Sequence, residues 1–119
     1  MNPEYERNQT VKLGEKKHKF ITDSGISIVN FYVSWSFYSR IQKLFLEKFK
    51  SVIGDNVKIY NVNADDNKML IEKYAVTSYP TILIFKNGEN VSHLTGLQDN
   101  FSLFEAVKKF ILPEDFSRN

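Results

Sequence analysis

Residues 26–40 read ISIVNFYVSWSFYSR, and the hydrophobic pattern changes its period within this stretch. The apolar run 26–33, interrupted at Asn30, is short and rich in β-branched and aromatic residues, which predicts a buried central strand. From Arg40 onward apolar residues recur at helical spacing, which predicts a helix that ends at Gly54. The residues expected on its buried face are Ile41, Leu44, Phe45, Phe49, Val52 and Ile53.

The rest of the chain alternates predicted strands with predicted helices. Asn87-Gly88 is the strongest hairpin signal, because both residues tolerate a positive φ. Strands are expected at 10–13, 57–63, 81–85 and 91–95, and helices at 14–25, 65–74 and 99–111, the last with Leu103, Phe104, Val107 and Phe110 on one face. Alternating strands and helices imply right-handed crossovers with parallel pairing, and the hairpin adds an antiparallel pair. The pattern therefore predicts one α/β domain at 10–112, between a flexible arm at 1–9 and a tail at 113–119.

Composition narrows the classes of function. The chain has 119 residues and no cysteine, so it forms no disulfide and has no thiolate metal site or cysteine nucleophile. Its 16 Lys and Arg residues against 14 Asp and Glu give a net charge of +2, which is too small to indicate nucleic acid or an anionic membrane as a partner. No apolar run approaches the ~18–20 residues of a membrane helix, and the polar N-terminus lacks a signal core, so we expect a cytoplasmic protein.

Other catalytic chemistries find little support in the sequence. A Ser-His-Asp hydrolase needs a histidine near its serine, but the only histidines, His18 and His93, are both expected at the surface. No spacing suits a zinc site and no glycine-rich loop suits a phosphate, so we expect no metal and no cofactor. The pair Asp65-Asp66 is typical of a helix start rather than of a metal site.

The element order and four local motifs resemble the thioredoxin family. The first motif, residues 29–40, is similar to the family's strand and Trp-Cys-x-x-Cys turn, with Ser36 and Ser39 in place of the two cysteines. The second motif, Tyr79-Pro80-Thr81, is similar to the family's cis-proline loop. The third, residues 81–89, is similar to its β-hairpin, and the fourth, Gly96, is similar to the glycine after its last strand. The likeness spans roughly residues 10–112 and implies the thioredoxin fold, in which helices flank both faces of a central mixed sheet.

The resemblance also implies an activity and a site. The family catalyses thiol–disulfide oxidoreduction, so Ser36 marks the position of the nucleophilic cysteine and Ser39 that of the resolving cysteine. Protein substrates or peptide segments would bind in a groove beside them. If the chain derives from a redox-active parent that has both cysteines, a reductase would return that parent to its reduced state. The groove residues that the resemblance implies are Trp35, Phe37, Tyr38, Tyr79, Pro80 and Gly96.

Two asparagines depart from the family's pattern. Asn30 stands where thioredoxins usually have a buried aspartate, and Asn61 stands where the lysine partner of that aspartate usually lies. Loss of the acid and the base together leaves no unpaired buried charge. We interpret Asn30 and Asn61 as buried polar support for the site, and direct contact between them is a hypothesis.

Two interpretations of the serines remain open. In the first, they are Cys-to-Ser replacements in a redox-active parent, which the retained Trp35, Arg40, Pro80 and Gly96 favour. In the second, the chain is a naturally redox-inert, thioredoxin-like domain that acts as a peptide-binding or chaperone-like adaptor, which the bulky Phe37-Tyr38 centre favours. Under both, the chain lacks the thiols that dithiol exchange requires, and the serines are expected to act as helix caps.

Overall fold

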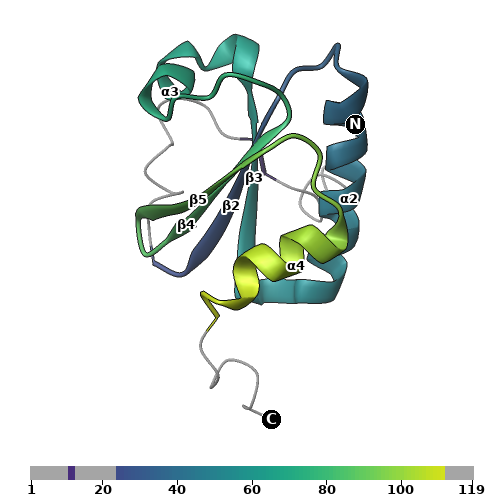
Figure 1. The fold of residues 1–119 in the computed structure, drawn as a ribbon, viewed down its shortest axis with the longest axis vertical. Helices are drawn as coiled ribbons and strands as arrows, with labels where there is room; N and C mark the ends of the chain where they lie inside the picture. The colour runs from purple at the N-terminus through teal and green to yellow at the C-terminus, as the bar shows by residue number, and fades with distance from the viewer. Residues whose placement is uncertain (1–10, 13–23, 112–119) are drawn as a thin grey trace.

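The computed structural model describes residues 11–12 and 24–111, and its centre is a five-stranded mixed sheet (Figure 1). The strands are β1 Val11–Lys12, β2 Ile26–Tyr32, β3 Val57–Asn63, β4 Thr81–Lys86 and β5 Glu89–Thr95. Their order in the sheet is β1-β3-β2-β4-β5. β3 runs parallel to β1 and β2, whereas β4 runs antiparallel to β2 and β5. The predicted α/β class with a mixed sheet is confirmed.

The described part of the chain contains three α-helices and two short 3-10 helices. They are α2 Phe37–Ile53, η2 Gly54–Asn56, η3 Ala64–Asp66, α3 Lys68–Lys73 and α4 Asn100–Lys108. α2 and α4 cover one face of the sheet, and α3 lies on the other (Figure 1). The helix expected at 14–25 falls almost entirely on residues outside the described ones, and the arm at 1–9 and the tail at 113–119 lie outside them as well.

Strand β2 is buried along its whole length, because both faces of the sheet are covered at its centre. Successive side chains of a strand point to opposite faces, so β2 contributes to two separate cores. Ile26 and Ile28 pack in the core that includes residues of α2 and α4, whereas Val29 and Phe31 pack in the core that includes α3. Full burial of one such side chain contributes roughly 1.5–3 kcal/mol. Both cores therefore hold the register of this strand.

The buried face of α2 differs from the one predicted from hydrophobic periodicity. Leu44 and Val52, predicted to be buried, are 59% and 81% exposed. The residues that are buried are Ser39, Gln42, Leu46, Phe49 and Ile53. α2 carries apolar residues on two sides, whereas the prediction assigned all of them to one buried face. Ser39 and Gln42 tolerate burial because their polar groups find hydrogen-bond partners there.

α4 is shorter than predicted, and its apolar face is narrower. The helix ends at Lys108, short of the predicted Ile111. Leu103 and Val107 are buried as predicted, but Phe104 is 40% exposed. One step along an α-helix rotates the side chain by about 100°, which moves Phe104 from the core to its margin.

The predicted Asn87-Gly88 turn is confirmed, and it also anchors the chain that enters β2. Asn87 has a φ of 50° and Gly88 a φ of 85°, the left-handed conformations that a tight hairpin requires. Asn87 Oδ1 accepts a hydrogen bond from the Gly25 N–H at 2.8 Å, and the Asn87 N–H donates to the Gly25 carbonyl at 2.9 Å. The asparagine therefore serves both the turn and the start of the central strand.

Two substitutions separate these two roles of Asn87. Asn87→Gly keeps the turn conformation and removes the side-chain bond to Gly25, so we expect the free energy of unfolding to fall by ~0.5–1.5 kcal/mol. Asn87→Ala also forces an ordinary residue to a positive φ, and we expect it to lose about a further 1 kcal/mol. Urea denaturation followed by circular dichroism measures both. Equal losses for the two variants would contradict a conformational role at this position.

Candidate functional site

The register of the sheet brings three loops to one edge. Thr81, the first residue of β4, lies opposite Phe31 near the end of β2 and opposite Thr95 at the end of β5. The segments that adjoin the sheet at this edge are 33–36, 78–80 and 96–99 (Figure 1). Each of these segments contains residues of the predicted site, so strand pairing gathers positions that are far apart in the sequence.

Ser36 and Ser39 connect the start of α2 to the end of β2. Ser36 is the N-cap, as predicted: its Oγ accepts from the Ser39 N–H at 3.2 Å, and its own N–H donates to the Val33 carbonyl at 3.2 Å. Ser39 is buried, and its Oγ accepts from the Val33 N–H at 3.3 Å. Ser36 thus stands at the helix N-terminus, where aligned peptide dipoles leave a partial positive charge, and Ser39 lies beneath it in the first turn.

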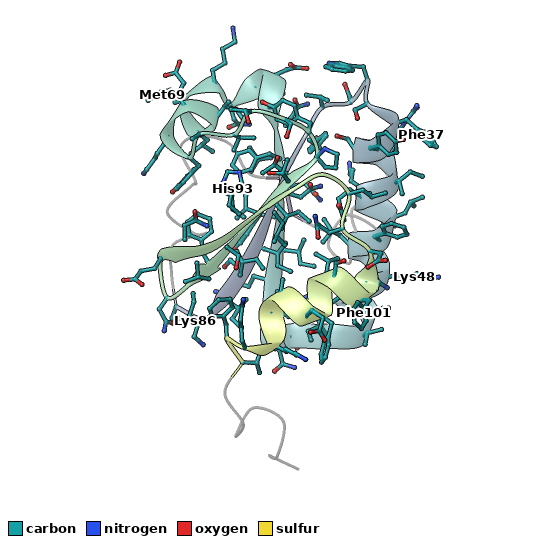
Figure 2. All side chains as sticks on the ribbon, viewed as in Figure 1. Phe37, Lys48, Met69, Lys86, His93 and Phe101 are labelled. Carbon is teal, nitrogen blue, oxygen red and sulfur yellow. The ribbon has the colours of Figure 1, made fainter. Side chains whose placement is uncertain are left out.

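Three aromatic side chains next to Ser36 in the chain are exposed. Trp35, Phe37 and Tyr38 are 75%, 56% and 62% exposed. Figure 2 shows Phe37 pointing away from the sheet at the N-terminal end of α2. The Phe37 and Tyr38 rings meet edge to face, with their centroids 5.7 Å apart. Exposed aromatic groups clustered in this way are typical of surfaces that bind other proteins.

Tyr79, Pro80 and Gly96 lie on the neighbouring loops of the same edge. The Tyr79–Pro80 peptide bond is cis, in keeping with the family resemblance, and the Pro80 carbonyl accepts from the Gly96 N–H at 2.9 Å. Gly96 has a φ of 87°, and no described atom lies within 4 Å of the place that a Cβ would take. Partial burial, and secondly the negative charge of Asp65, raise the pKa of the Tyr79 hydroxyl.

The predicted contact between Asn30 and Asn61 is confirmed. Asn30 Nδ2 donates to Asn61 Oδ1 at 2.9 Å, and the two residues are paired in register between β2 and β3. Both are buried, and strand alternation places Asn30 with Ile28 on the face that α2 and α4 cover. Asn30 Oδ1 has no hydrogen-bond partner among the described residues. The pair supplies buried polarity without a group that titrates.

Gln42 is a residue at this edge that sequence reasoning missed. It is buried in α2, and its side-chain amide makes two hydrogen bonds to the backbone of Gln98 in the loop before α4. A glutamine in an amphipathic helix is ordinarily assigned to the solvent face. The signal that was available is its spacing, since Gln42 stands three residues after Ser39 and four before Leu46, on the stripe that is buried.

Other candidate chemistries find no support in the described residues. His93 is exposed, as predicted, and His18 lies outside the described part of the chain. Among residues 11–12 and 24–111, no group of three or more His, Cys, Asp or Glu side chains is placed to hold a metal ion. No helix in these ranges is long and apolar enough to cross a membrane.

Comparison with known proteins agrees with this geometry. A family model described as "Thioredoxin" matches residues 9–109. The thioredoxin of Bacillus subtilis is 30% identical over 101 residues, which cover 85% of this chain and 97% of that protein. The thioredoxin of Rickettsia typhi is 33% identical over 84 residues, 71% of this chain and 80% of that protein. Among solved structures, a mutant thioredoxin from Halobacterium salinarum has a TM-score of 0.79 at 20% identity, covering 88% of this chain and 93% of that one, and this likeness concerns the fold.

The capping role of Ser36 is testable by substitution. Ser36→Ala removes the acceptor for the Ser39 N–H, so we expect the free energy of unfolding to fall by ~1 kcal/mol. Ser36→Asp keeps an acceptor and adds a negative charge at the helix N-terminus, so we expect it to retain stability. Ser51→Ala on the exposed side of α2 is the matched control, with little change expected. Chemical denaturation measures all three, and wild-type stability of Ser36→Ala would contradict the capping role.

The Asn30–Asn61 pair is testable by a double-mutant cycle. Asn61→Leu leaves the buried Asn30 amide without its partner, so we expect a loss of ~1–3 kcal/mol in the free energy of unfolding. The double substitution Asn30→Leu with Asn61→Leu removes both polar groups, and we expect it to lose less than the sum of the single losses. Strictly additive losses would show that the two side chains do not stabilise one another.

Proposed function

Because the chain belongs to the thioredoxin family, we propose that it is the Cys-to-Ser form of a redox-active parent with cysteines at positions 36 and 39. The observation that carries the proposal is the place of Ser36, at the N-terminus of α2 directly after the exposed Trp35. The family's chemistry needs a thiolate at such a place, because the partial positive charge of the helix end lowers the thiol pKa. With serine at positions 36 and 39 the chain is inactive in dithiol exchange, since a serine hydroxyl forms no mixed disulfide.

In the proposed parent the reaction is a two-electron exchange. The thiolate at position 36 attacks one sulfur of a substrate disulfide, forms a mixed disulfide and releases the other substrate sulfur as a thiolate. The thiol at position 39 loses its proton, attacks the mixed disulfide at the sulfur of position 36 and releases the second substrate thiolate. The substrate has then gained two electrons and takes up two protons, while positions 36 and 39 have become a disulfide. A reductase, or a small dithiol, returns the protein to its reduced state.

Accessibility supports this division of roles. Ser39 is buried, whereas Ser36 is partly accessible at the head of the helix. A substrate disulfide would therefore reach position 36 first, and the buried thiol at position 39 would attack only after the mixed disulfide has formed. This order agrees with the nucleophilic and resolving roles that the family resemblance implies.

We propose that the partners are protein disulfides and extended peptide segments, bound between the aromatic side chains that follow β2 and the Tyr79–Pro80 loop. Trp35, Phe37 and Tyr38 supply apolar area, and the open side of Gly96 leaves room for a backbone to approach. We place this activity in the cytoplasm, where thiols are kept reduced and a dithiol reductant is regenerated.

A second candidate is a naturally redox-inert adaptor that uses the same groove. The large exposed area of Phe37 and Tyr38, the two residues between the serines, favours it. Such an adaptor would bind unfolded or extended segments without covalent chemistry. The two candidates share a binding surface and differ in whether the thiols, once present, turn over a disulfide.

Restoring both thiols tests the redox proposal. We expect Ser36→Cys with Ser39→Cys to reduce insulin disulfides when dithiothreitol supplies the electrons, measured as the turbidity of the released chain. We also expect the thiol at position 36 to titrate below the ordinary cysteine pKa of about 8.5, because it stands at the helix N-terminus. The pH dependence of alkylation measures that pKa.

The controls distinguish the two candidates. Ser36→Cys with Ser39→Ala lacks the resolving thiol, so it should accumulate a mixed disulfide with insulin and show no turnover. A double-cysteine variant that is folded by circular dichroism and no faster than dithiothreitol alone would overturn the redox proposal. Binding of a reduced, unfolded polypeptide by the unsubstituted chain would then favour the adaptor.

A further inference from the structure

A buried glutamine joins α2 to the loop between β5 and α4. Gln42 is completely buried on the inner side of α2, between Ser39 and Leu46. Its Nε2 donates to the Gln98 carbonyl at 2.9 Å, and its Oε1 accepts from the Gln98 N–H at 2.7 Å. The donor and the acceptor of the side chain are thus both paired with the backbone of one residue, as a neighbouring strand would pair with it.

The loop carries this connection on to Pro80. Gln98 Nε2 donates to the carbonyls of Thr95 at 3.3 Å and Gly96 at 3.2 Å, which folds the loop on itself. The Gly96 N–H donates to the Pro80 carbonyl at 2.9 Å. A continuous path of hydrogen bonds therefore runs from Gln42 in α2, through Gln98 and Gly96, to the proline loop.

Several hydrogen bonds hold this loop in place. Leu97 is its only aliphatic side chain, and Leu97 is exposed. Asp99 at the end of the loop is the N-cap of α4, with Oδ1 accepting from the Ser102 N–H at 2.9 Å. That bond fixes the end that leads into α4, so the bonds of Gln42 and Gly96 are the ones that orient residues 96–98.

We propose that Gln42 is a positioning residue that fixes the loop 96–98 relative to the N-terminus of α2 and so sets the shape of the substrate groove. This inference rests on the proposed function, because it concerns the groove in which a substrate would bind. Gln42 is buried and contacts no substrate itself. Without the Gln42 side-chain amide, the N–H and carbonyl of Gln98 lose their hydrogen-bond partners. The loop must then move toward water to satisfy these two groups. Gly96 and its contact with Pro80 would move with it.

The substitution Gln42→Met tests the proposal, because methionine is similar in length and unbranched but has no amide. In the variant with Ser36→Cys and Ser39→Cys, we expect Gln42→Met to raise the KM for insulin about tenfold. We expect little change in the rate at which the thiol at position 36 reacts with a small aromatic disulfide, which needs no groove. We also expect faster hydrogen exchange at the Gly96 and Gln98 amides, with the amides of β2 unchanged.

A matched control separates positioning from loss of stability. Leu46→Ala removes a buried side chain one turn along the same face of α2, so it destabilises the fold without touching the loop. We expect Leu46→Ala to leave the KM for insulin unchanged at a temperature where it is folded. A KM that rises as much in Leu46→Ala as in Gln42→Met, or unchanged exchange at Gly96 and Gln98 in Gln42→Met, would overturn the proposal.

Conservative rescue gives an independent readout. A protonated glutamic acid has one donor and one acceptor and so restores both bonds to Gln98, whereas the carboxylate cannot donate to the Gln98 carbonyl. In Gln42→Glu, we expect the Gly96 amide resonance to lie at its unsubstituted position once the introduced side chain is protonated. A resonance that stays displaced down to a pH of about 3, where the carboxyl group is protonated, would count against the proposal.

Different measurements test the proposed redox function and the proposed role of Gln42, so the failure of one can be told from the failure of the other. If the double-cysteine variant with Gln42 intact does not reduce insulin, the proposed redox function fails. Hydrogen exchange at Gly96 and Gln98, measured in the chain with both serines present, decides the role of Gln42 in either case.

Discussion

Strand β2 pairs with a parallel neighbour, β3, on one side and with an antiparallel neighbour, β4, on the other. It is buried on both faces, so two hydrophobic cores hold its register. A slip of one residue would exchange the two faces and carry Asn30 from one core to the other. The arrangement of the site depends on this constraint, because the end of β2, the start of β4 and the end of β5 share one edge of the sheet only in this register.

Neutral side-chain amides form buried hydrogen bonds on the face of the sheet that α2 and α4 cover. Asn30 and Asn61 hydrogen-bond across two parallel strands, and Gln42 bonds to the backbone of Gln98. An amide costs less to remove from water than an ion, and it does not titrate. These buried amide contacts are therefore independent of pH through the neutral range. A thiol at position 36 would be the group that responds to pH there, because it would stand at the exposed helix end.

Most of the fold was predictable from local patterns. The run at 26–33, the Asn87-Gly88 turn and the alternation of strands with helices each follow from the chemistry of adjacent residues, and the structure confirms the run, the turn and the alternation from residue 24 onward. The outward side of α2 was not predictable in the same way. Leu44 and Val52 are as apolar as Leu46 and Phe49, so periodicity alone could not decide which stripe meets the sheet. On the side that does meet the sheet, Gln42 bonds to the backbone of Gln98.

The sequence by itself determined the class of fold and the place of the helix cap at Ser36, because both depend on residue types at short spacing. The positions of a redox pair at Ser36 and Ser39 follow from the resemblance of residues 29–40 to the thioredoxin family. Only the tertiary structure decided that Ser39 is buried while Ser36 is accessible, that Asn30 contacts Asn61, and that Gln42 reaches the loop before α4. The physical reason is the separation along the chain. Gln42 and Gln98 are 56 positions apart, and their hydrogen bonds exist only after the packing of α2 and α4 on one face of the sheet brings them together.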